Sequence, residues 1–230
     1  MKNSKDKIIM CIAVTTLLFV YTFSAKAQNL EAGFRFMPTL SSLKMSTSSG
    51  GTVKGEATFG YGIGAFVGFN FTKHFGIQGE FIYNSISQKY KEQDFENKIN
   101  LRYINIPILL SFNTSKTSVV NLNIVAGPQF GISVGNNIHT SASEGQVTTK
   151  GVLVVKAGDI GIAYGAGLDF GLNTSRTFRL GFGFRGVAGL IDISDDSKTV
   201  ETDQYYLLQK TYINTYSLYI GLSFLFGKSE

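Results

Sequence analysis

Residues 212–226, YINTYSLYIGLSFLF, carry the pattern that decides the fold. Large apolar or aromatic residues recur at every second position, and mostly small or polar residues stand between them. A period of two is typical of an extended strand, whose side chains point alternately to opposite faces. The run covers about 15 residues, whereas an ordinary strand has roughly 5–6. Such a long amphipathic strand is typical of a transmembrane β-barrel.

The same pattern recurs along the chain and predicts eight long antiparallel strands. We expect them at roughly residues 29–41, 57–71, 75–90, 97–112, 118–134, 159–172, 177–192 and 211–226. The connections alternate between short turns and longer loops, as in outer-membrane barrels, whose turns are periplasmic and whose loops are external. The segment 97–112 changes phase near Tyr103, just before Pro107, so we expect a bulge there.

The bulk of the apolar face indicates that it points outward. Each strand offers about six or seven large apolar side chains, more than the interior of an eight-stranded barrel holds. A soluble barrel with the opposite orientation would need a polar face rich in Lys and Glu, but here that face is mostly Gly, Ser and Asn. The sequence therefore predicts an all-β, eight-stranded transmembrane barrel with a closed, polar lumen, built from residues 28–230 as one domain.

The N-terminus predicts export. Three Lys residues precede an apolar run over 8–23, and Ala25-Lys26-Ala27 matches a small-x-small cleavage site, so we expect a signal peptide at residues 1–27. The alternative, an anchor helix, needs roughly 20 apolar residues, and this run is shorter. The single cysteine, Cys11, lies in this segment, so the mature chain is expected to have no disulfide. The predicted location is the outer membrane of a Gram-negative cell.

The basic net charge does not predict nucleic-acid binding. The whole chain carries +5. Residues 1–27 hold four Lys and one Asp, a net charge of +3, so the predicted mature chain keeps only +2. We therefore expect outer-membrane lipids and lipopolysaccharide as partners, together with envelope or secretion-machinery proteins, and no nucleic acid.

Charged residues on the inner face are the candidate functional residues. The alternation places in the lumen Glu31, Arg35, Gln78, Glu80, Arg102, Asp169, Arg179 and Arg185. Because both signs are present, these side chains can neutralise one another as a structural charge network. The alternative that stays open is a narrow pore for ions or small solutes, or a ligand site in the lumen.

Four segments resemble the PorT-like outer-membrane β-barrel family of Bacteroidetes-type bacteria. They are LRYINIPILL at 101–110, AGPQFG at 126–131, the Asp/Gly-rich strand 159–171 and the closing strand 218–226. These motifs are structural rather than catalytic. The family takes its name from a component of a secretion and gliding machinery, so the resemblance implies a barrel and, as one expectation, an accessory role in protein secretion.

Catalytic and cofactor motifs are scarce. His74 and His139 are the two histidines and are expected on opposite sides of the membrane, although Ser141 and Ser143 stand near His139. The glycine runs at 60–64 and 165–167 alternate within strands and open no helix, which a dinucleotide site requires. An acidic loop contains Asp192, Asp195, Asp196, Glu201 and Asp203, without the spacing of an EF-hand. We expect no enzyme, no cofactor and no metal site, and a structural or envelope-associated role; a surface-loop binding or adhesion barrel is a further alternative.

Overall fold

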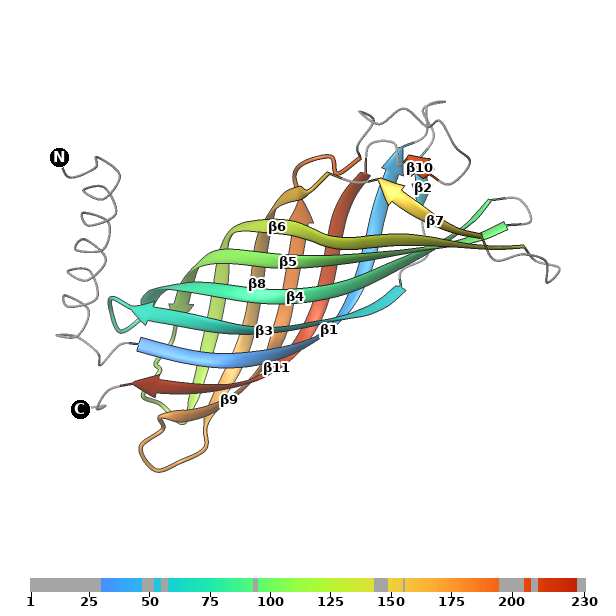
Figure 1. Ribbon diagram of the computed structural model, residues 1–230. Helices are drawn as coiled ribbons and strands as arrows, with labels where there is room; N and C mark the ends of the chain where they lie inside the picture. The colour runs from blue at the N-terminus through green and yellow to red at the C-terminus, as the bar shows by residue number, and fades with distance from the viewer. Residues whose placement is uncertain are drawn as a thin grey trace, which may run out of the picture.

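Eight long antiparallel strands form a closed barrel, as the sequence predicts (Figure 1). The computed structural model describes residues 30–46, 52–54, 58–92, 95–142, 149–154, 156–194, 205–207 and 211–226, so the predicted signal peptide lies outside the described residues. The barrel strands are β1 (Leu30–Ser46), β3 (Thr58–Asn70), β4 (Phe75–Glu92), β5 (Phe95–Asn113), β6 (Val120–Ala142), β8 (Gly158–Gly171), β9 (Phe178–Gly189) and β11 (Thr211–Phe226). No helix within these ranges is long and apolar enough to cross a bilayer.

The barrel closes by pairing the first strand with the last. β1 and β11 run antiparallel, with Leu30 opposite Phe226, and β6 pairs directly with β8. The order around the barrel is β1, β3, β4, β5, β6, β8, β9 and β11. Three short strands extend this wall at one end. They are β2 (Thr52–Lys54), which pairs with β1, β7 (Thr149–Val154), which pairs with β6, and β10 (Tyr205–Leu207), which runs parallel to β7.

The two ends of the barrel differ in their connections. Residues 71–74, 114–119 and 172–177 make short turns at the end where β1 begins and β11 stops (Figure 1). We call this the turn end and the opposite end the loop end. At the loop end β4, β5 and β6 run on past the other strands (Figure 1). β6 alone has 23 residues, although about 9–11 suffice to cross a bilayer.

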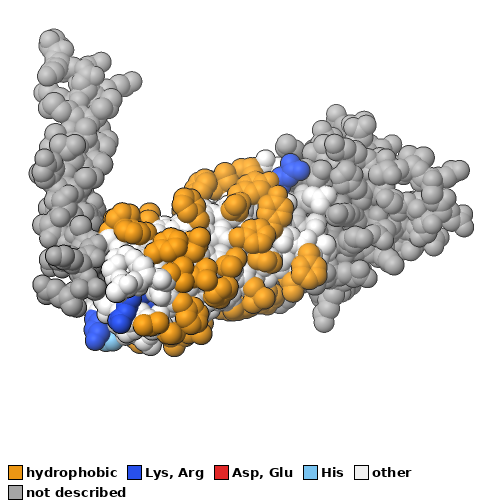
Figure 2. Space-filling model, turned by 90° about the horizontal axis from the view of Figure 1, so that it is seen from below, with side chains coloured by type: hydrophobic (Ala, Val, Ile, Leu, Met, Phe, Trp, Pro, Cys, Tyr) orange, Lys and Arg blue, Asp and Glu red, His pale blue; other side chains and the backbone are white. Residues whose placement is uncertain are grey.

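Large apolar side chains cover the outside of the barrel. In β8 buried and exposed residues alternate without a break from Asp159 to Asp169, and the exposed ones include Ile162 and Leu168. Figure 2 shows such side chains covering one face of the wall. The predicted outward orientation of the large residues is confirmed. A closed barrel can expose them to lipid because its backbone groups are bonded within the wall.

The lumen is less polar than expected. Besides charged and amide side chains it contains two apolar clusters. One consists of Leu109, Val125, Ala163 and Val187, and the other of Met37, Ile82 and Tyr219. These residues close the gaps between the polar groups, so that side chains fill the interior, as the width of an eight-stranded barrel requires.

The predicted bulge lies near Tyr103, but Pro107 does not cause it. Tyr103 pairs with Ser133 while Arg102 pairs with Gly135, so Val134 of β6 is the extra residue. The register is the same on both sides of Pro107. The bulge leaves the alternation of β5 intact, and this decides where Arg102 points.

Candidate functional site

Glu80 of β4 is the hub of a buried cluster in the middle of the lumen. Its Oε1 accepts hydrogen bonds from Arg35 Nη1 at 2.5 Å, from Gln78 Nε2 at 2.5 Å and from Arg185 Nη2 at 2.9 Å. Its Oε2 accepts a bond from Arg185 Nη1 at 3.0 Å. Only 1 % of the Glu80 side chain is exposed. We call Arg35, Gln78, Glu80 and Arg185 the central cluster.

The central cluster ties opposite walls of the barrel together. β4 and β9 lie four strands apart in the ring of eight, so the two bonds between Glu80 and Arg185 span the diameter. Arg35 reaches the same carboxylate from β1 and lies between two aromatic rings. Its Cζ is 4.1 Å from the centre of the Phe66 ring and 4.8 Å from that of Tyr219. These rings stabilise the guanidinium, since the face of an aromatic ring attracts a cation.

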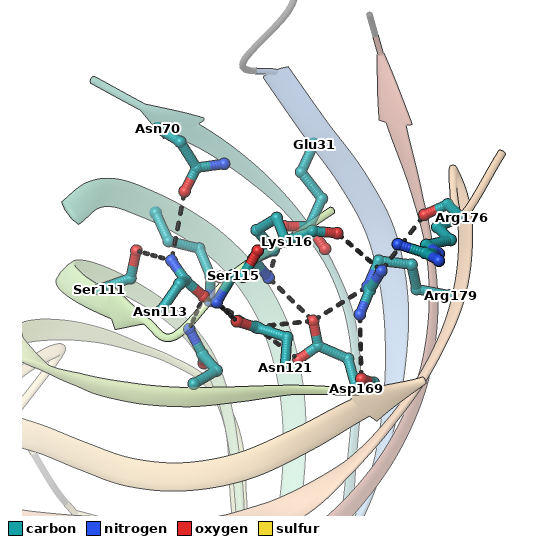
Figure 3. A network of polar contacts seen from close by, with 12 residues as sticks. Glu31, Asn70, Ser111, Asn113, Ser115, Lys116, Asn121, Asp169, Arg176 and Arg179 are labelled. Carbon is teal, nitrogen blue, oxygen red and sulfur yellow. Dashed lines mark hydrogen bonds and ion pairs between the residues drawn. The ribbon is translucent and has the colours of Figure 1, made fainter. Parts of the chain in front are cut away.

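A second ionic cluster closes the turn end. Lys116 projects from the turn between β5 and β6 and binds Glu31 of β1 at 2.9 Å and Asp169 of β8 at 3.2 Å (Figure 3). Arg179 of β9 binds the same Asp169 carboxylate through its Nε at 3.2 Å. We call Glu31, Lys116, Asp169 and Arg179 the turn-end cluster. It joins three strands and one turn, and its formal charges cancel.

Arg179 also fixes the backbone of the turns. Its side chain is fully buried, and its Nη1 donates to the carbonyl oxygens of Lys116 at 2.7 Å and Ser118 at 3.1 Å. Its Nη2 donates to the carbonyl oxygen of Asp169 at 3.0 Å. Burial alone would lower the pKa of the Lys116 ammonium, but the adjacent carboxylates of Glu31 and Asp169 hold this pKa above its usual range. Lys116 is therefore a fixed cation of the turn end.

Three buried asparagines extend the turn-end cluster. Asn121 donates to Asp169 Oδ2 at 3.0 Å, and its own carbonyl accepts the amide of Ser115 at 2.8 Å (Figure 3). Asn121 and Asn123 both donate to Asn113 Oδ1, at 3.1 and 2.9 Å. Since buried amides need partners, this ladder specifies how the turn folds into the mouth of the lumen.

Six of the seven charged residues expected in the lumen lie in these two clusters, and Arg102 does not. Arg102 is exposed between the buried residues Leu101 and Tyr103, because β5 keeps its alternation through the bulge. The prediction for Arg102 is therefore wrong. Sequence reasoning also missed Lys116, because this residue lies in a short turn between two predicted strands and alternation within a strand says nothing about it. A signal was available, because Glu31 and Asp169 stand within two residues of strand ends on the same side of the barrel.

The other candidate residues lie apart from the lumen. His74 is exposed in a turn, where a ring nitrogen lies 3.0 Å from the Asn113 carbonyl and the ring stacks on Phe112. The backbone of His139 belongs to β6, but its side chain lies outside the described part of the chain, as do Asp195, Asp196, Glu201 and Asp203. Among the described residues, no three His, Cys, Asp or Glu side chains are placed to hold a metal.

Asp192 of the acidic loop turns back onto the barrel. Its Oδ1 accepts hydrogen bonds from the amides of Ser194 at 3.0 Å and Thr211 at 2.7 Å, and from the Ser194 hydroxyl at 2.8 Å. Burial opposes the charge, but these bonds keep the pKa of the Asp192 carboxyl below its usual range. This carboxylate therefore anchors the start of the loop to β11.

A comparison with family models identifies the kind of barrel, and several solved structures resemble the chain. A family model described as outer membrane protein beta-barrel domain matches residues 26–195. The outer membrane protein OprG from Pseudomonas aeruginosa is 13% identical, with a TM-score of 0.51 over 85% of this chain and 96% of that one. Neisserial surface protein A is 12% identical, with a TM-score of 0.47 over 86% and 97% of the two chains. The attachment invasion locus protein Ail of Yersinia pestis is 16% identical, with a TM-score of 0.41 over 85% and 99%. No curated protein sequence matches the chain.

Proposed function

Because the chain belongs to the outer membrane protein beta-barrel domain family, we propose that it is a closed, non-enzymatic scaffold of the outer membrane and not a pore. The family places the barrel in the outer membrane. The rest of the proposal depends on how the lumen is filled. A scaffold needs a rigid wall and an interior that keeps the membrane sealed, and the buried clusters support both parts of the proposal.

The bond across the diameter carries the proposal. Glu80 and Arg185 meet in the middle of the lumen, with side chains exposed by only 1 % and 3 %. The turn-end cluster closes a second level through Lys116 and Asp169. An ion passing along the axis would have to break ion pairs that are shielded from water, where charges interact strongly. Engaged in this way, these groups are also poorly placed to act as acids or bases, which supports a non-enzymatic role.

Conductance in planar bilayers tests the proposal. The folded wild-type protein is expected to insert without producing current steps. A variant with Arg35, Glu80 and Arg185 all replaced by Ala serves as the positive control, since it opens the middle of the lumen and should conduct. Retention of the folded gel band without heating shows that both proteins are barrels. Regular current steps from the wild type would refute a closed scaffold.

We further propose that the loop end is the contact surface of the scaffold. The outward apolar residues of β6 run from Val120 to Val134, and the polar sequence GNNIHTSA continues the same strand over 135–142. The extension of β4, β5 and β6 is therefore expected to stand clear of the bilayer, where lipopolysaccharide or another envelope protein can reach it. Replacing residues 88–99 by a two-residue turn should preserve the barrel and abolish cross-linking to such partners. Unchanged cross-linking would refute this surface.

The resemblance to the PorT-like family supports a finer proposal, an accessory role in protein secretion. It rests on the segments 101–110, 126–131, 159–171 and 218–226. A strain that lacks the gene should lose secreted proteins, and the intact gene should restore them. An unchanged profile of secreted proteins would refute the secretion role and leave the scaffold proposal standing.

A further inference from the structure

A small cavity lies between the central cluster and the loop end, lined by polar side chains and by Ile86, Val187 and Ile213. It has a volume of about 10 Å³, and its polar lining consists of Asn84, Tyr103, Asn105, Gln129 and Asp159, together with Thr215. A cavity needs roughly 10–15 Å³ to hold one water molecule. The space therefore suits one water molecule or one ion without a hydration shell.

The strand register brings Asn105 and Asp159 to the two sides of Gly131. Asn105 of β5 lies opposite Gly131 of β6, and Gly131 lies opposite Asp159 of β8. Gly131 has no side chain, so the side chains of its neighbours occupy the middle of this row. A Cβ atom added at Gly131 would lie 2.9 Å from Asn105 Oδ1, 3.2 Å from Asp159 Cβ and 3.4 Å from Tyr103 Cδ1. The neighbouring side chains thus surround the place that a larger residue would fill.

Asp159 differs from the other buried carboxylates of the lumen. Glu31, Glu80 and Asp169 each bind Lys or Arg. Asp159 is only 6 % exposed, and its Oδ1 has no hydrogen-bond partner in the described part of the chain. Tyr103 is 2 % exposed, and Asp159 and Ser133 are the polar neighbours of its hydroxyl. Buried charges in proteins are normally paired or bound to metals, so this carboxylate lacks the counter-charge that its burial requires.

The donor set defines the chemistry of the missing partner. The cavity offers one carboxylate, three amide side chains, one phenol and one aliphatic hydroxyl, all of which supply oxygen. Oxygen donors of this kind select hard cations, and Ca²⁺ accepts a flexible set of carboxylate and amide oxygens. Mg²⁺ fits poorly because it keeps several water molecules, for which the cavity has no space.

We propose that Asp159, Asn105 and Tyr103 form a binding site for one hard cation, Na⁺ or Ca²⁺, in the loop-end half of the lumen. Asp159 supplies the charge, while the amide and phenol oxygens complete the coordination. The cation replaces the Lys or Arg that the other buried carboxylates use, and it links β5 to β8 across Gly131. The site is independent of the proposed scaffold function, since a sealed lumen with or without this ion does not conduct.

Tyrosine-sensitised Tb³⁺ luminescence tests the site directly. The chain contains no tryptophan, so tyrosine alone sensitises Tb³⁺, and Tyr103 is part of the proposed site. The folded wild-type barrel in detergent should show saturable Tb³⁺ emission that Ca²⁺ or Na⁺ displaces, and the more effective competitor identifies the ion. Asp159→Asn should weaken Tb³⁺ binding at least tenfold. Asp192→Asn is the matched control at the same end of the barrel and should leave binding unchanged.

Three outcomes of the luminescence experiment would overturn the proposal. They are the absence of saturable emission, emission that Asp159→Asn leaves unchanged, and emission lost in Asp192→Asn instead. Unfolding midpoints guard against a variant that fails to fold, since Ca²⁺ or Na⁺ should raise the midpoint of the wild type but not that of Asp159→Asn. An infrared carbonyl band of a protonated carboxylic acid, present in the cation-saturated wild type and absent in Asp159→Asn, would show that a proton takes the place of the cation.

Discussion

Replacing Glu80 by Gln should lower the free energy of unfolding of the barrel more than any substitution on its surface. The substitution keeps the shape of the side chain but removes the single negative charge that faces two buried guanidinium groups. It also places an amide NH₂ group among donors. Each carboxylate oxygen of Glu80 accepts an N–H of Arg35 or Arg185, so in either orientation the NH₂ group of the new amide faces another donor.

The structure sets the size of the expected effect. Removing one partner of a buried ion pair costs about 3–5 kcal/mol, because the other charge stays buried and unpaired. Arg35 keeps the rings of Phe66 and Tyr219, and such cation–π contacts recover about 0.5–2 kcal/mol. We therefore expect a loss near the lower limit, about 3 kcal/mol in the free energy of unfolding. With a urea dependence of about 2 kcal/mol per M, the midpoint should fall by about 1.5 M.

Urea titration of the barrel in lipid vesicles, followed by circular dichroism, measures this shift. A triple variant, Arg35→Met with Glu80→Met and Arg185→Met, is the control. It removes every charge of the cluster at similar volume, and such replacements are often neutral or stabilising, so its stability should lie within about 1 kcal/mol of the wild type. A loss below about 0.5 kcal/mol for Glu80→Gln would refute the reasoning, since effects of that size are typical of surface substitutions.

Three further predictions concern other parts of the barrel. Arg179→Met should destabilise the fold by about 3 kcal/mol in urea titration, because it removes the buried guanidinium that donates to three carbonyl oxygens and is one of the two cations at the Asp169 carboxylate; a wild-type midpoint would contradict this. Lys116 has a raised pKa, so its contribution to the stability of the fold is complete below its unfolded pKa and is lost as the pH rises through the folded pKa. Asp192 has a lowered pKa, so its contribution is lost only in acid. Unfolding midpoints should therefore fall at both ends of the pH range, and Lys116→Met should remove the alkaline fall. Gly183→Ala should cost about 1–3 kcal/mol because the new Cβ would lie 2.5 Å from the Ala166 carbonyl oxygen and 2.6 Å from the Tyr219 ring. A Tyr219→Leu background should relieve the part of this cost that comes from the ring.

The wall of the barrel is predictable from the sequence because one periodicity governs it. In β8 the alternation of Gly or Asp with Ile, Tyr and Leu assigns every residue to its face, and the eight strands follow from the same rule. In β5 this periodicity alone does not assign every residue to the correct face. The sequence changes phase at Tyr103, but the extra residue lies in the partner strand at Val134, and a single strand cannot show which of two partners bulges.

The contents of the lumen are less predictable, because they depend on how long side chains meet across it. Two near-identical turns show the difficulty. The sequence NTSKT begins with Asn113, which points into the lumen, and its Lys116 enters the turn-end cluster. The sequence NTSRT begins with Asn173, which stays exposed and bonds within its own turn. The carboxylates that bind Lys116 come from distant strands, so the sequence of the turn alone does not predict whether its basic side chain enters the lumen.

The seam between β1 and β11 also determines how the molecule is made. Leu30 and Phe226 stand at opposite ends of the described chain and yet share one ladder, so the ring has no closed intermediate. Until the C-terminal strand arrives, two strand edges present unbonded amides and carbonyls, which hydrocarbon does not tolerate. Contacts so distant in sequence form slowly. A chain that stops short of residue 211 leaves both edges unpaired, so we expect it not to form a closed barrel in the membrane.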